Sequence, residues 1–170
     1  MTAPQMVVHV ADSFRACLGE LDVRPIHMAV SYIPEGSPTV TPYLAVKGVA
    51  ELIDFLKVTF DAQEIGRIVT PEGSIMNAEV VIGTSRLMMG DPRDRPSETA
   101  MLYVYVPDCD AVYARALAAG ATSIMAPADM FYGDRSGAVQ DPSGNKWWIA
   151  THKEDVSHEE IVRRAASARR

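Results

Sequence analysis

The sequence contains a faint internal repeat with a period of 60 residues, and this repeat constrains the fold more than any other feature. The two copies share one order of patterns: an alternating stretch, a stretch with helical spacing, then three more alternating stretches separated by turn signals. The matched pairs are Val46 with Val106, Leu52 with Val112, Leu56 with Ala116, Arg86 with Lys146, and Leu87 with Trp147. A duplication of this size indicates two modules, each with an incomplete core that it buries against its own helix and its twin.

Each copy is predicted to be a βαβββ module, which makes the fold class α+β. In the first copy we predict strands at 40–46, 64–69, 75–82 and 86–89, and a helix at 49–60. In the second copy we predict strands at 101–106, 123–127, 135–140 and 146–151. Its helix begins at Asp108 or Asp110 and ends at Ala119, with Gly120 as the stop signal.

The repeat also divides the chain. Residues 1–38 are predicted to be an N-terminal extension, with a short helix at 12–21 followed by prolines and glycine that break regular structure. Residues 39–152 form the duplicated domain, with module 1 at 39–90, a linker at 91–99 and module 2 at 100–152. The tail at 153–170 has a helix signal, because Ser157 precedes two glutamates and the end is basic.

Composition argues against several kinds of binding partner and cellular location. The 170 residues carry 16 Lys and Arg against 22 Asp and Glu, a net charge of −6, so we expect no nucleic-acid partner. The longest apolar run, residues 100–106, is far short of the roughly 20 residues that span a bilayer, so we expect no membrane partner. Two distant cysteines, Cys17 and Cys109, give no disulfide framework, which favours a cytoplasmic location.

Three motifs in this order carry a family resemblance. They are Thr41-Pro42-Tyr43-Leu44-Ala45-Val46, Val106-Pro107-Asp108 and Asp141-Pro142-Ser143-Gly144-Asn145-Lys146. Together with the paired modules, they resemble the vicinal oxygen chelate superfamily, the group of glyoxalase I, bleomycin-resistance proteins and extradiol dioxygenases. Three more stretches resemble its PhnB-like branch: Ile33-Pro34-Glu35-Gly36, Phe131-Tyr132-Gly133-Asp134-Arg135-Ser136-Gly137, and Ala150-Thr151-His152-Lys153-Glu154-Asp155-Val156. The resemblance implies a glyoxalase-like domain whose two modules form a curled mixed sheet cup, usually in a homodimer, with ligand or metal inside the cup.

Strand alternation predicts which side chains face this cup. Successive side chains of a strand point to opposite faces, so apolar residues such as Leu44 and Leu102 should lie under the helices. Asn77 and Glu79 are assigned to the cup, because a buried polar group without a partner is costly. The predicted ligand-binding residues are Tyr43, Asn77, Met88, Met101, Tyr103, Tyr105, Tyr132, Arg135 and Trp148.

The resemblance also points to where a metal would be held. In metal-using members the ligands come from the first and last strands of each module, and the matching positions here are Thr41, Met88, Met101 and Trp148. Zinc, iron and nickel sites draw on imidazole, carboxylate or thiolate ligands, and none of these four residues supplies one. We therefore predict neither a metal at the inherited site nor any other cofactor.

These expectations favour a metal-independent, homodimeric protein that binds or sequesters a small aromatic or amphipathic molecule. Arg135 is predicted to clamp an anionic group of that ligand with two hydrogen bonds. One alternative is an enzyme of the same superfamily: either a lyase or isomerase that recruits a metal through His152 and Glu79, or a metal-free enzyme with Glu79 as the acid–base catalyst. Another is a scaffold without a pocket, whose tail or N-terminal extension docks a partner.

Overall fold

The structure is a computed structural model and describes residues 31–168. Both modules lie in one compact unit that begins at Gly36. The helix expected at 12–21 lies outside the described residues. No helix in the described part of the chain has the length and apolar character that crossing a membrane requires.

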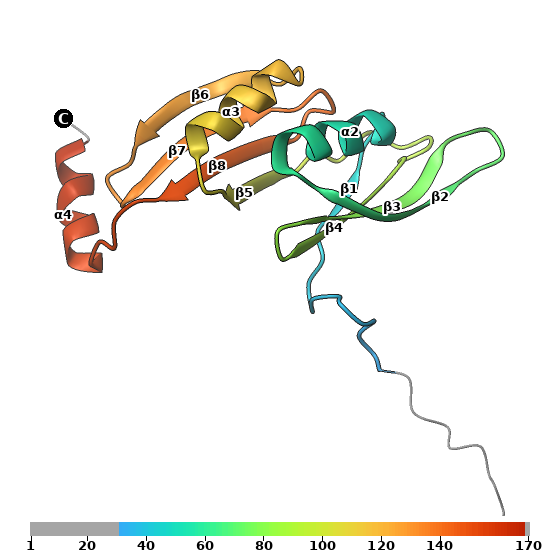
Figure 1. The fold of residues 1–170 in the computed structure, drawn as a ribbon, viewed down its shortest axis with the longest axis horizontal. Helices are drawn as coiled ribbons and strands as arrows, with labels where there is room; N and C mark the ends of the chain where they lie inside the picture. Colours follow the sequence, from blue (N-terminus) through green and yellow to red (C-terminus); the bar gives the residue numbers. More distant parts are fainter. Residues whose placement is uncertain (1–30, 169–170) are drawn as a thin grey trace, which may run out of the picture. The chain divides into compact units, whose positions relative to one another are not determined.

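The first module is a four-stranded mixed sheet with one helix (Figure 1). Its elements are β1 (Tyr43–Ala45), α2 (Val49–Phe60), β2 (Gln63–Val69), β3 (Ile75–Ile82) and β4 (Ser85–Gly90). The strand order is β1-β4-β3-β2, with β1 parallel to β4 and the other pairs antiparallel. The helix predicted at 49–60 is confirmed residue for residue, because its apolar side chains at helical spacing, from Val49 to Phe60, pack into the core, while Val58 on the other side is exposed.

The second module repeats this topology. Its elements are β5 (Met101–Tyr105), α3 (Cys109–Ala118), β6 (Thr122–Asp129), β7 (Asp134–Gln140) and β8 (Lys146–His152), followed by the tail helix α4 (His158–Ala168). The strand order β5-β8-β7-β6 matches that of the first module position for position. Asp108 caps α3, since its carboxylate accepts a hydrogen bond from the backbone N–H of Ala111 at 3.0 Å. The duplicated βαβββ fold is therefore confirmed.

Strand β1 is shorter than predicted, three residues where 40–46 were expected. Pro38 and Pro42 have no backbone N–H to donate to a ladder, so the strand cannot extend toward them with full pairing. The carbonyl of Pro42 still accepts a hydrogen bond from the backbone N–H of Met88 at 2.9 Å. The chain thus stays beside β4 in this region without forming regular strand.

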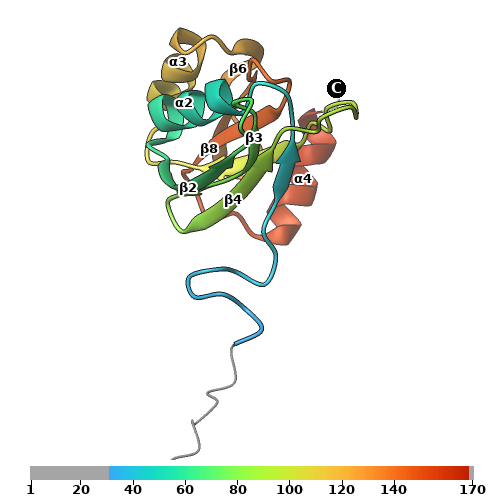
Figure 2. The same ribbon diagram turned by 90° about the vertical axis from the view of Figure 1, so that its right-hand side faces the viewer.

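The two sheets do not close into one cup. Within residues 31–168, every named strand pairs only with strands of its own module. The modules meet instead through their helices and core aromatics: Arg115 on α3 donates to the carbonyl of Thr59 at 2.8 Å, and the rings of Phe60 and Trp147 lie 5.0 Å apart. Figures 1 and 2 show α2 and α3 side by side on the same side of the two sheets. The resemblance predicts one curled cup. Within a single chain, the two sheets instead form two separate open surfaces.

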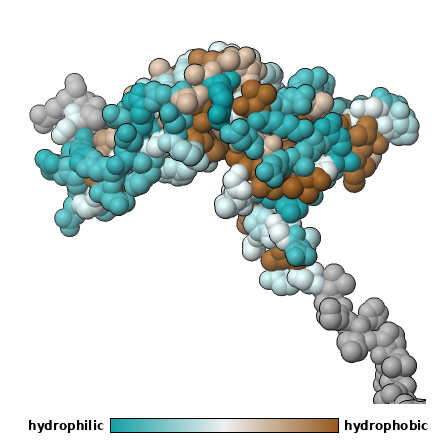
Figure 3. Space-filling model, viewed as in Figure 1, coloured by the Kyte–Doolittle hydropathy of each residue, from teal (hydrophilic) through white to brown (hydrophobic). Residues whose placement is uncertain are grey.

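Each sheet buries one face under its helix and leaves the other open. Leu44, Leu87, Trp147 and Ile149 are buried on the helix side, as the alternation predicted. The opposite faces carry exposed apolar side chains, including Met101 and Tyr105. In Figure 3, apolar surface gathers near the middle of the view, over the region where β5, α2 and β4 lie. Unburied apolar patches of this kind mark binding surfaces.

Candidate functional site

The most organised polar cluster lies on the face of the second sheet opposite α3, which we call the tyrosine face. Strand β5 is an edge strand, and its alternation directs Met101, Tyr103 and Tyr105 to this face, with exposures of 71%, 45% and 64%. The ring centroids of Tyr103 and Tyr105 are 5.3 Å apart. Trp148 on β8 is in register with Tyr103 and half-buried, so it belongs to the same face. These residues form an aromatic platform.

Beneath the platform lies a buried carboxylate, Asp134, whose side chain is only 5% exposed. It accepts hydrogen bonds from the hydroxyls of Tyr105 at 3.0 Å and Tyr103 at 3.3 Å. Burial, followed by the hydrogen bond with Tyr132, raises the pKa of Tyr103 well above its usual range. The hydrogen bond to Asp134 raises the pKa of Tyr105. Both phenols therefore stay protonated as donors, which fixes the two rings in place.

His152 completes this cluster from strand β8. Its register pairing with Asp134 brings the imidazole Nδ1 to 2.9 Å from a carboxylate oxygen. The other ring nitrogen, Nε2, lies 3.1 Å from Asp155. Only the doubly protonated ring donates to both carboxylates, so the hydrogen bonds with Asp134 and then Asp155 raise the pKa of His152 above its ordinary value.

This raised pKa predicts a pH-dependent contribution to stability. A group whose pKa is higher in the folded than in the unfolded chain stabilises the fold fully below its unfolded pKa of about 6.5. This contribution to stability is lost as the pH rises through the pKa that His152 has in the folded protein. We expect the difference in unfolding free energy between wild type and His152→Gln to be larger at pH 5.5 than at pH 8.5, measured by urea denaturation. A difference that does not change with pH would show that the imidazolium is not held by these carboxylates.

The predicted residues on the first sheet form a separate group. Tyr43 is in register with Met88, and Glu79 is in register with the same methionine from the other side. The carboxylate of Glu79 accepts a hydrogen bond from Nη1 of Arg86 at 2.6 Å. Asn77 is half-buried two positions away on the same strand. The catalytic role predicted for Glu79 stays a prediction, and the structure adds that its carboxylate is ion-paired.

Arg135 is not brought to the tyrosine face. Because Asp134 points to that face, the next side chain of β7 points to the opposite one. There, Nε and Nη2 of Arg135 both bind the carboxylate of Asp110 on α3, and Nη1 donates to Asp129 at 3.1 Å. The guanidinium lowers the pKa of Asp110. All three nitrogens are engaged by carboxylates, so the structure offers no free edge for the ligand clamp expected here.

Sequence reasoning missed the role of Asp134. Asp134 binds Tyr103, Tyr105 and His152, which lie on other strands. One signal was available. The turn at 141–145 places strand residue 140 opposite 146, and counting back from this turn places Asp134 opposite His152.

The inherited metal positions do not suit a metal. Thr41 and Met88 lie with the first sheet, and Met101 and Trp148 with the second. They offer a hydroxyl, two thioethers and an indole, a donor set that does not hold zinc, iron or nickel. Among residues 31–168 there is also no cluster of three His, Cys, Asp or Glu side chains that could hold an ion.

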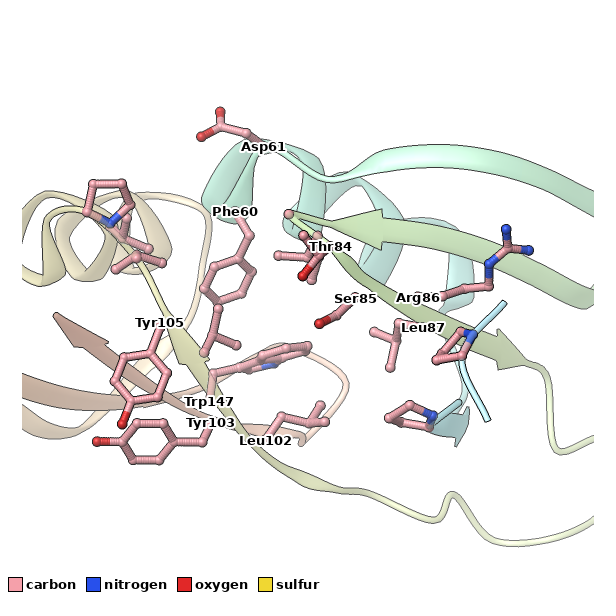
Figure 4. Close-up of a pocket in the computed structure, with 18 of the residues that line it drawn as sticks. Phe60, Asp61, Thr84, Ser85, Arg86, Leu87, Leu102, Tyr103, Tyr105 and Trp147 are labelled. Atoms are coloured by element: carbon pink, nitrogen blue, oxygen red, sulfur yellow. The ribbon is translucent and has the colours of Figure 1, made fainter. Parts of the chain in front are cut away.

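A cleft of about 790 Å³ lies where the two modules meet, and we call it the seam cleft (Figure 4). Its walls come from the segment before β1, the end of α2, the β3–β4 turn, strand β5 and the start of β8. The residues that shape its middle and its ends are Phe60, Arg86, Leu87, Leu102, Tyr103, Tyr105 and Trp147. Tyr103 and Tyr105 thus border both the tyrosine face and the seam cleft.

This architecture consists of two βαβββ modules of the same topology, each with one open sheet face. Residues 36–149 match the Glyoxalase/Bleomycin resistance protein/Dioxygenase superfamily. An uncharacterized protein of Mycobacterium bovis is 34% identical over 136 residues, covering 73% of this chain and 90% of the relative. One of Mycobacterium tuberculosis shows the same identity, with 80% of its length covered. The chain belongs to this superfamily, as the resemblance predicted.

Solved structures show the same fold. TioX from a Micromonospora species has a TM-score of 0.59 at 23% identity, covering 68% of this chain and 99% of that one. A PhnB protein from Bacillus cereus, named as a putative 3-demethylubiquinone-9 3-methyltransferase, has a TM-score of 0.58 at 20% identity, covering 67% and 99%. The PhnB-like resemblance therefore has a counterpart among the structural neighbours. At this identity, the likeness concerns the fold.

Proposed function

We propose that this protein binds a small aromatic or amphipathic molecule on the tyrosine face without the help of a metal. The observation that carries the proposal is the platform of Tyr103 and Tyr105, whose rings are exposed while their hydroxyls are fixed on the buried Asp134. Rigid, exposed aromatic rings give a flat ligand a large contact area at a low entropic cost. The side chains at the inherited metal positions also support binding without a metal, because their donor atoms do not hold zinc, iron or nickel.

Binding is favoured over catalysis by how the polar groups are occupied. Glu79 is paired with Arg86, and Asp134 already accepts from two tyrosines and lies against His152. A general base needs a lone pair within reach of the substrate proton. Here these carboxylates orient neighbouring protein groups, which is the role expected in a binding site.

The test is the effect of Trp148→Ala on ligand affinity. The neutral fluorescent amine N-phenyl-1-naphthylamine serves as the probe, because it is a flat aromatic molecule without charge. We expect Trp148→Ala to weaken its binding by more than about 1 kcal/mol, the scale of one aromatic contact, while the protein stays folded. Fluorescence titration measures the affinity, and circular dichroism checks the fold.

Tyr43→Ala is the control, because Tyr43 lies on the first sheet, at the position that corresponds to Tyr103 on the second, and pairs there with Met88. Its affinity for the probe is expected to stay within about twofold of wild type. An unchanged affinity in Trp148→Ala, or no binding by wild type, would reject the proposal. An equal loss of affinity in both variants would show that the binding site is not confined to the second sheet.

We also propose that the protein is a homodimer. Each open sheet face exposes apolar side chains, among them Ile68 on β2 and Met101 on β5, and a second copy would remove both patches from water. Light scattering should give twice the chain mass of 18.5 kDa. A monomer at micromolar concentration would contradict this.

A further inference from the structure

We propose that the ligand is an amphipathic acid that extends from the tyrosine face into the seam cleft, with its apolar body against the aromatic residues of the cleft and its acidic group on Arg86. This inference rests on the proposed function, because Tyr103 and Tyr105 form one end of the same cleft (Figure 4). It adds the class of the ligand and names the residue that selects the class.

The walls of the cleft suit a bulky apolar body. In Figure 4, Phe60, Trp147 and Leu102 lie in the middle, the two tyrosines at one end, and Arg86 with Leu87 at the other. The volume of about 790 Å³ falls in the range of about 300–1,000 Å³ that holds ligands of drug-like size. Apolar surface that the ligand removes from water here contributes to affinity in proportion to its area.

Arg86 offers hydrogen-bond donors that the described residues do not use. Its side chain is 18% exposed, and only Nη1 is engaged, by Glu79 at 2.6 Å. Its Nε is buried and has no hydrogen-bond partner among the described residues. A buried donor without a partner carries a desolvation cost, which an oxygen acceptor would relieve.

The unused edge of Arg86 has the geometry that binds a carboxylate. It consists of Nε and Nη2, the same pair of nitrogens with which Arg135 holds Asp110 and Arg67 holds Glu64 in this protein. This edge matches the two oxygens of a carboxylate. Gly36 lies close beside this edge, and a larger residue there would crowd it, since a Cβ at that position would come within 3.2 Å of Nη2.

The other arginine of the cleft is not an equivalent anchor. Arg115 donates through Nε and Nη2 to the carbonyl of Thr59, and Nη2 also reaches Asp61 at 3.1 Å. Its two-donor edge is therefore occupied by the junction of the two modules. Of the two arginines that line the cleft, Arg86 alone presents this edge unpaired within residues 31–168.

The experiment compares two dyes that share one ring system. 8-Anilinonaphthalene-1-sulfonate carries an anionic group, and N-phenyl-1-naphthylamine is the same molecule without it. In fluorescence titrations, Arg86→Gln should weaken binding of the anionic dye by about tenfold or more and change the neutral dye by less than about twofold. Glu79→Gln should tighten the anionic dye, because it removes the competing carboxylate from Arg86. Arg95→Gln, a change at an exposed linker arginine, is the control and should alter neither dye.

The outcomes separate this inference from the proposed function. If the neutral dye binds and depends on Trp148, but Arg86→Gln leaves the anionic dye unchanged, the acid-binding role of Arg86 is wrong and the proposed function stands. Equal weakening of both dyes in Arg86→Gln would show a structural role for Arg86, which also overturns the inference. If neither dye binds wild type, both fail.

Discussion

Trp147→Ala is expected to destabilise the protein by about 4 kcal/mol, measured as the free energy of unfolding in urea. The indole is 1% exposed and packs on Phe60 at a centroid distance of 5.0 Å, so its removal leaves a cavity where the two modules meet. Its Nε1–H also donates to the buried carboxylate of Asp141 at 2.8 Å. That oxygen would keep its hydrogen bond from the side chain of Asn145, so the cavity dominates the loss.

Trp148→Ala is the matched control for this prediction. It removes the same side chain one position along β8, from a half-buried site on the opposite face. Its cost in stability is expected to be about 1 kcal/mol, because less apolar surface returns to water. Equal losses in the two variants would show that β8 does not alternate between the core and the tyrosine face.

The same alternation explains how much of the fold could be predicted from the sequence. The helix at 49–60 and the inward residues of β5 and β8 follow from local periodicity, which the final structure preserves. The separation of the two sheets does not follow from it. That arrangement depends on contacts between residues far apart in sequence, such as Arg115 with Thr59 and Phe60 with Trp147.

The candidate site shows the same limit. Tyr103, Tyr105 and Trp148 were found because strand parity and register bring them to one face. The polar partners were assigned less well, since a charged residue binds whichever opposite group the strands bring near. Arg135 found Asp110 on α3 and not a ligand position, and Arg86, which was given no binding role, turned out to line the seam cleft.

The stretch from Phe131 to Gly137 connects the tyrosine face to the tail. Asp134 anchors the two tyrosines, and the residue before it, Gly133, accepts backbone hydrogen bonds from Lys153 and Glu154 at 2.9 and 3.0 Å. Glu154 in turn pairs with Arg164 on α4. A change at Gly133 should therefore reach both the platform and the terminal helix.

Gly133→Ala is expected to destabilise the protein by about 3 kcal/mol, from left-handed backbone strain together with overpacking. The residue has a φ of 102°, and a Cβ there would lie 2.2 Å from the carbonyl oxygen of Glu154. Backbone cannot yield as a flexible side chain does, so the segment leading to α4 must move. Limited proteolysis should then cut near α4 faster than in wild type, alongside a lower unfolding free energy in urea.

Gly73→Ala separates left-handed backbone strain from overpacking as the cause of the lost stability. Gly73 has a similar φ of 90° in the β2–β3 turn, but a Cβ there meets nothing within 4 Å. It should therefore show the strain alone, about 1 kcal/mol, and leave proteolysis at α4 unchanged. The excess in Gly133→Ala measures the contact between this turn and the segment after β8. If the two glycine variants lose the same stability, that close contact does not exist in solution, and the tail helix is not held through Gly133.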